Sequence, residues 1–67
     1  MENWTSVFTT DKLYKAELVR TSLLENGIEA VILNKEDSSF TTFGEIDVMI
    51  PKEDADRATE IIKSVKL

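Results

Sequence analysis

The spacing of the apolar residues changes period along this 67-residue chain, and this change sets the order of its secondary-structure elements. The segment NWTSVFTT is rich in β-branched and aromatic residues and predicts a strand, whereas residues 11–26 carry apolar side chains at the helical period. The segments IEAVILN and EIDVMIP predict two further strands. Pro51 ends the second of these, and acidic residues then favour the start of another helix. The expected order is strand, helix, strand, strand, helix.

Each predicted helix carries one apolar stripe, and we expect both stripes to face a common core. Asn26 and Gly27 end the first helix, because Gly27 suits the left-handed position that follows a helix. The stripes comprise Leu13, Ala16, Val19, Leu23 and Leu24 on the first helix, and Ala55, Ala58, Ile61, Ile62 and Val65 on the second.

A strand–helix–strand unit followed by a hairpin and a second helix is most of the split βαβ plan. We therefore predict an α+β, ferredoxin-like βαββα fold in which residues 1–67 form a single domain. Its two helices should cover one face of a three-stranded antiparallel or mixed sheet. The closing residues SVKL leave no room for the fourth strand of the full plan. The first strand is then expected at an edge, where its unpaired backbone groups favour pairing with another chain.

The composition argues against several classes of function. The chain has no cysteine and no histidine, so a thiol mechanism or a catalytic triad lacks its central groups, and we expect no enzymatic activity. The net charge of −5 repels nucleic-acid backbones and anionic lipids, and no segment is long and apolar enough to cross a bilayer. We expect a soluble, cytoplasmic protein that binds neither nucleic acid nor membranes. The acidic clusters match no calcium loop, so no metal or cofactor is expected.

The sheet face away from the helices is expected to carry apolar side chains of its own, with Asp47 among them. Alternation gives the outer face Val7 or Phe8, Ile32 or Leu33, and Met49. Two inward sets fit the first strand equally well, Trp4-Ser6-Phe8 and Thr5-Val7-Thr9. An uncovered apolar face and an open edge favour a homo-oligomer through either surface. A monomer that exposes some apolar surface is the alternative.

Two phenylalanines interrupt the polar segment NKEDSSFTTFGE, which joins the second and third strands. Phe40 and Phe43 have a structural interpretation, in which they fold over the end of the core, and a functional one, in which they anchor a partner. Aromatic residues dominate binding hot spots, and loops on rigid scaffolds often carry function. The predicted partner-binding residues are therefore Phe40, Phe43, Met49 and Phe8.

The first helix holds a second group of candidates. Arg20 falls within its apolar stripe, and either its stem covers the core while the charge reaches solvent or Glu17, or it binds an anion. Tyr14 and Leu18 form an apolar pair off the stripe, which is either an ordinary surface pair or part of a docking surface.

The segments KAELVRTSLLENGIEAVILN and GEIDVMIPKEDADRATEII resemble a small bacterial family, a domain of unknown function named for prokaryotic signal transduction. The shared features are an early Trp and strand, Ala16-Glu17, Leu24-Glu25, Gly27-Ile28, Val48, Ile50-Pro51, Glu53-Asp54 and Ala58. The resemblance implies a GlnB-like fold, similar to that of the nitrogen-regulatory trimers. In those proteins a loop between the second and third strands engages target proteins, and residues 34–44 hold that position here.

Two hypotheses for function follow. The first is a non-enzymatic regulatory or adaptor module that contacts a protein partner through the 34–44 loop and the open sheet face. The alternative is a sensor of a small metabolite or nucleotide that binds at an interface between protomers, with Arg20 supplying an anion contact.

Overall fold

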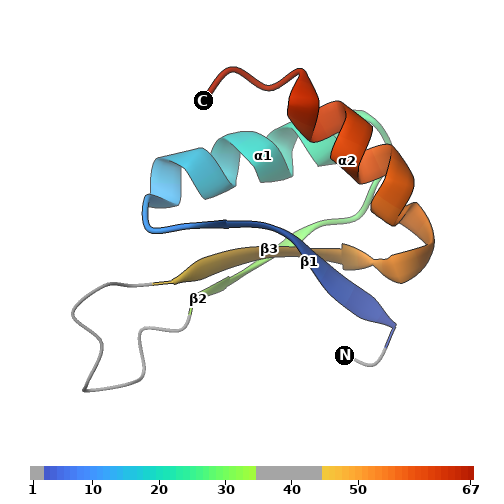
Figure 1. Ribbon diagram of the computed structural model, residues 1–67, viewed down its shortest axis with the longest axis horizontal. Coiled ribbons are helices and arrows are strands. Elements are labelled where there is room, and N and C mark those ends of the chain that lie inside the picture. Colours follow the sequence, from blue (N-terminus) through green and yellow to red (C-terminus); the bar gives the residue numbers. More distant parts are fainter. Residues whose placement is uncertain (1–2, 35–44) are drawn as a thin grey trace.

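A computed structural model describes residues 3–34 and 45–67 of the chain. Within these ranges the elements follow the order β1 (Trp4–Thr10), α1 (Leu13–Glu25), β2 (Val31–Asn34), β3 (Ile46–Pro51), the short 3-10 helix η1 (Lys52–Asp54) and α2 (Ala55–Lys63) (Figure 1). This order and the helix-on-sheet arrangement confirm the predicted α+β, ferredoxin-like fold.

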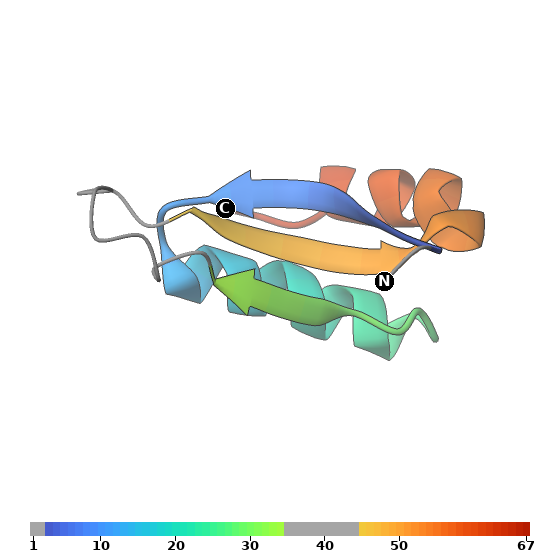
Figure 2. The same ribbon diagram turned by 90° about the horizontal axis from the view of Figure 1, so that it is seen from below.

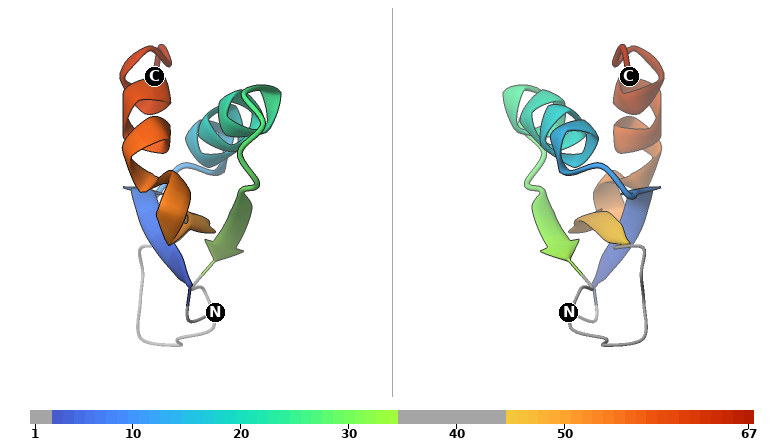
Figure 3. Two further views of the ribbon diagram at one scale, coloured as in Figure 1. Left: turned by 90° about the vertical axis from the view of Figure 1, so that its right-hand side faces the viewer. Right: turned by 90° about the vertical axis from the view of Figure 1, so that its left-hand side faces the viewer.

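The described strands form an antiparallel sheet in the order β1-β3-β2. Both helices lie on one face of it, with α1 on the flank of β2 and α2 on the flank of β1 (Figures 2 and 3). Among the described strands β1 lies at an edge, as predicted, and β2 lies at the other. The central strand β3 is the most deeply buried, with Ile46, Val48 and Ile50 turned to the helices.

The core lies between the sheet and the helices. Among the described residues, its buried members are Ala16, Val19, Leu23, Ile28, Ala30, Ile46, Val48, Ile50 and Ala58. The prediction that Leu13 and Leu24 are buried was wrong, since they are 50% and 45% exposed. A narrow sheet covers only one side of a helix, so the buried stripe of α1 is restricted to Ala16, Val19 and Leu23.

A β-bulge in β1 changes which side chains face the core. Ser6 is paired with Met49 and Phe8 with the next residue, Val48, so Val7 is the extra residue. Val7 and Phe8 both pack against the core, and the prediction that they point to opposite faces was therefore wrong. Neither regular inward set describes this strand, because the bulge breaks the alternation on which both were based.

The C-terminal end of α1 is a Schellman motif, in which the N–H of Ile28 donates to the Leu23 carbonyl at 2.9 Å and that of Gly27 to the Leu24 carbonyl at 3.0 Å. Gly27 has the positive φ of 79° that the sequence predicts. Leu23 and Ile28 are both fully buried, so this motif turns the chain directly from α1 into the core.

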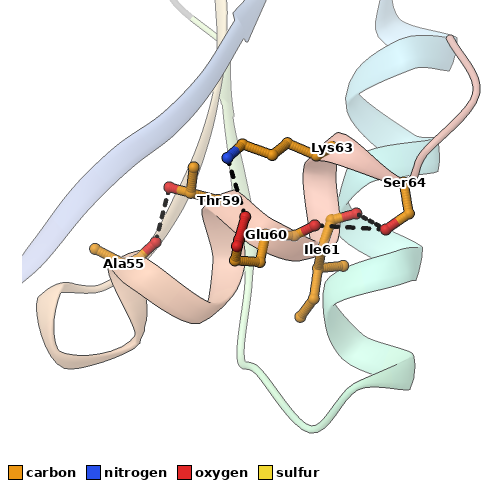
Figure 4. A network of polar contacts seen from close by, with 6 residues as sticks. All are labelled: Ala55, Thr59, Glu60, Ile61, Lys63 and Ser64. Atoms are coloured by element: carbon orange, nitrogen blue, oxygen red, sulfur yellow. Dashed lines mark hydrogen bonds and ion pairs between the residues drawn. The ribbon is translucent and has the colours of Figure 1, made fainter.

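The exposed side of α2 carries local polar contacts (Figure 4). The Thr59 hydroxyl donates to the Ala55 carbonyl at 2.9 Å, and Lys63 pairs with Glu60 at 3.0 Å. The Ile61 carbonyl in the last turn accepts from both the hydroxyl of Ser64, at 3.1 Å, and its N–H, at 3.0 Å. These contacts are all local to α2, so they do not tie its outer side to another element.

Candidate functional site

The strand face opposite the helices carries a group of side chains that we call the open face. Two rows of paired residues run across the strands, Ser6–Met49–Val31 and Thr9–Asp47–Leu33. Because side chains alternate along a strand and Val48 faces the core, both rows point to the opposite face. The open face comprises Trp4, Ser6, Thr9, Val31, Leu33, Asp47 and Met49. Figure 2 looks onto this face, where the described strands lie in front of both helices.

The apolar part of the open face is continuous across two strands. Met49 is paired with Val31, and both are half-buried, while Leu33 is 40% exposed one step further along β2. Trp4 lies at the other end of the face, opposite Pro51. These side chains form an apolar strip that neither α1 nor α2 covers.

A polar cluster accompanies this strip. Asp47 is 7% exposed, and its Oδ1 accepts hydrogen bonds from the Thr9 hydroxyl at 2.7 Å and the Ser6 hydroxyl at 3.4 Å. The predicted position of Asp47, beside Met49 on the outer face, agrees with the strand register. Because Ser6 and Thr9 lie on either side of the bulge, this carboxylate fixes the register of β1 against β3.

The predicted partner-binding residues are not all brought together. Met49 lies on the open face, but Phe8 is paired with Val48 and packs against the core. The bulge is the physical reason, because it turns Phe8 inward together with Val7. Phe40 and Phe43 lie outside the described residues.

A hollow of about 360 Å³ lies at the Trp4 end of the sheet, lined by Asn3, Trp4, Pro51, Lys52 and Glu53. The Lys52 N–H donates to the Asn3 carbonyl at 2.7 Å and holds the two chain segments together there. Sequence reasoning missed this hollow, since the pairing of Trp4 with Pro51 depends on a register that the sequence alone does not give.

The second group of candidates lies on α1, on the other side of the core. Tyr14 and Leu18 are 59% and 45% exposed and line a shallow hollow of about 490 Å³ together with Glu17, Thr21, Ser22 and Glu25. Arg20 is exposed, is not part of this lining, and forms no ion pair with the residues in 3–34 and 45–67. The two glutamates in the hollow oppose an anionic ligand there.

A third hollow, of about 400 Å³, lies between the helices and is lined by Asn26, Asp56, Arg57, Glu60 and Ile61. The Arg57 guanidinium donates to the Asn26 carbonyl at 3.1 Å and approaches Asp54 at 3.6 Å. This cation lies at the C-terminal end of α1, where the helix dipole favours positive charge. Asn26 therefore marks the side of α1 that faces α2.

In residues 3–34 and 45–67, no three side chains of the metal-binding types come close enough to hold an ion. No helix of that part has the length and apolar character needed to span a membrane.

Comparison with known proteins identifies the family to which this chain belongs. Neither the curated proteins nor the solved structures contain a match to this chain. A family model with the description "Putative prokaryotic signal transducing protein" matches residues 4–66. This range extends from the first residue of β1 to beyond the last of α2 and so includes the open face and α1. The chain therefore belongs to the family that carries this description.

Proposed function

We propose that this protein is a non-enzymatic regulatory or adaptor module that binds a protein partner through its open face. The observation that carries this proposal is the strip of Val31, Leu33 and Met49 on a sheet face that neither α1 nor α2 covers. Burial of these apolar side chains against a partner removes them from water and so lowers the free energy of the complex. The sheet and the 34–44 loop that joins β2 to β3 then form one recognition surface.

The chemistry of the open face suits a partner with an apolar segment. Met49 acts as an adaptable anchor, because its side chain is unbranched and polarisable. Leu33 is the second anchor, because it is the apolar side chain of the strip that is most exposed to water. Trp4, at the edge of the 360 Å³ hollow, adds an aromatic contact. Asp47 is already hydrogen-bonded to Thr9, so it contributes to the shape of the surface more than to new contacts.

The experiment is a capture of binding partners from lysate of a prokaryote that produces this protein, with the full chain as bait. The double variant Leu33→Ser/Met49→Ser should lose at least about tenfold in partner capture, since an anchor pair in a hot spot is worth more than 1.4 kcal/mol. Leu18→Ser is the matched control, because this leucine is 45% exposed, against 40% for Leu33, but lies on α1.

The loop is tested separately with Phe40→Ser/Phe43→Ser, which should also reduce capture of the same partner. Circular dichroism melting shows which variants are folded. If the folded Leu33→Ser/Met49→Ser variant captures the partner as well as the Leu18→Ser control does, the open face is not the binding site.

A further inference from the structure

One side of α1 carries a four-residue seam that shares no residue with the open face. Leu13, Glu17, Arg20 and Leu24 follow one another at spacings of four, three and four residues, which is the seam period of a coiled coil. All four are exposed, and the leucines are 50% and 45% exposed. Two leucines thus flank one acidic and one basic residue along an exposed edge of the helix.

The seam faces away from α2. Asn26 lines the hollow between the two helices, and Lys15 and Ser22, at the spacing that places them on the same side as Asn26, are half-buried. The seam residues lie about half a helical turn from that side. Since α1 lies on the flank of β2 and α2 on the flank of β1, the seam forms the outer flank of the molecule (Figures 2 and 3).

The seam is complementary to itself in an antiparallel arrangement. When two copies of α1 are aligned antiparallel about their midpoint, Leu13 meets Leu24 of the other copy, and in the same register Glu17 meets Arg20. This is the pairing of facing layers in an antiparallel coiled coil. A parallel arrangement would instead place Glu17 against Glu17 and Arg20 against Arg20, so the charges select the antiparallel one.

We propose that a second copy of this chain occupies the seam and forms a two-fold symmetric dimer. The contact is isologous, because each Glu17 meets the other copy's Arg20 and both pairs form at once. Charge complementarity identifies this occupant, since Arg20 forms no ion pair within residues 3–34 and 45–67 and this register places the other copy's Glu17 opposite it. The two-fold axis lies along the sheet normal and leaves both open faces on the same side of the dimer.

Sedimentation equilibrium of the full chain tests this proposal. The unmodified protein should form dimers, whereas Arg20→Glu or Glu17→Arg should weaken dimerisation about tenfold or more, because each places like charges at both pairs. An equimolar mixture of these two variants should restore the dimer as a heterodimer. The double variant Glu17→Arg/Arg20→Glu should restore it as a homodimer.

The controls separate the seam from general effects of charge and hydrophobicity. Lys52→Glu makes the same change in net charge as Arg20→Glu but lies in η1, and Leu18→Ser removes an exposed leucine of α1 that lies off the seam. Both should dimerise normally, whereas Leu13→Ser/Leu24→Ser should not. The proposal is overturned if the unmodified chain is monomeric at about 1 mM, where even a millimolar dissociation constant leaves association visible. It is equally overturned if the mixed charge variants fail to associate.

Discussion

At the scale of single residues, Asp47 has the clearest effect on the fold. In a regular strand Ser6 and Thr9 would lie on opposite faces, because they are an odd number of residues apart. The bulge at Val7 brings both hydroxyls to one face, where a single carboxylate oxygen accepts from each. Asp47 thus holds together the two halves of β1 across the irregularity.

Replacement of Asp47 by Ala should destabilise the protein by about 2 kcal/mol, since it removes the buried, charged acceptor of the short 2.7 Å hydrogen bond from the Thr9 hydroxyl. This corresponds to a fall in Tm of about 10 °C for a domain of this size, measurable by urea and thermal unfolding. Glu29→Ala makes the same change in net charge at an exposed position and should stay within about 0.5 kcal/mol of the unmodified protein. Equal stability of the two variants would contradict the role given to Asp47.

At the scale of the elements, the exit from α1 depends on a backbone conformation more than on packing. Gly27 adopts a φ of 79°, and a Cβ at this position would meet no atom within 4 Å. The cost of a side chain there comes from the left-handed conformation itself. Two hydrogen bonds and the burial of Ile28 depend on this one turn.

Gly27→Ala should therefore destabilise the protein by about 1–2 kcal/mol, although the added methyl group has room. Gly27→Asn should cost less, because asparagine tolerates this conformation better than alanine does. Urea unfolding of the two variants measures the difference. If alanine were the better tolerated of the two, the cost would not come from the backbone.

The order of the elements, the edge position of β1 and the conformation of Gly27 could all be predicted from the sequence. These features depend on local spacing and local residue preference, which a sequence displays directly. The bulge could not be predicted, because Val7 and Phe8 are both apolar and either fits an inward position. The hydroxyl partners of Asp47 and the hollow beside Trp4 could not be predicted either, because both depend on the strand register that the bulge sets. Leu13 and Leu24 were misplaced because the width of the sheet decides how much of a helix is covered.

At the scale of the whole molecule, the fold has one helix layer and one sheet layer, so the outer side of the sheet and the outer side of the helices expose different kinds of side chain. The open face offers an apolar strip to a partner, and the seam on α1 offers a self-complementary edge to a second copy. A domain of this size gains little from its own core, and association adds to its stability.

A dimer that unfolds to separate chains has a Tm that depends on concentration. We expect the Tm of the unmodified protein to rise by about 3–5 °C for each tenfold increase in protein concentration, once most chains are dimeric. The Tm of Arg20→Glu should stay constant over the same range. Differential scanning calorimetry at several concentrations distinguishes these outcomes, and identical behaviour of both proteins would exclude the seam as the source of the dependence.

The bulge also has a consequence for evolution by insertion and deletion. Loss of Val7 would leave Ser6 opposite Met49 and Phe8 opposite Val48, which is the register of an uninterrupted strand. A relative that lacks this residue could therefore keep Thr9 beside Asp47, at the expense of one buried valine. Loss of a residue from β3 would instead shift its pairing with both neighbouring strands and turn its core residues outward. Deletion of a residue should accordingly be tolerated at position 7 of β1 and selected against in the central strand β3.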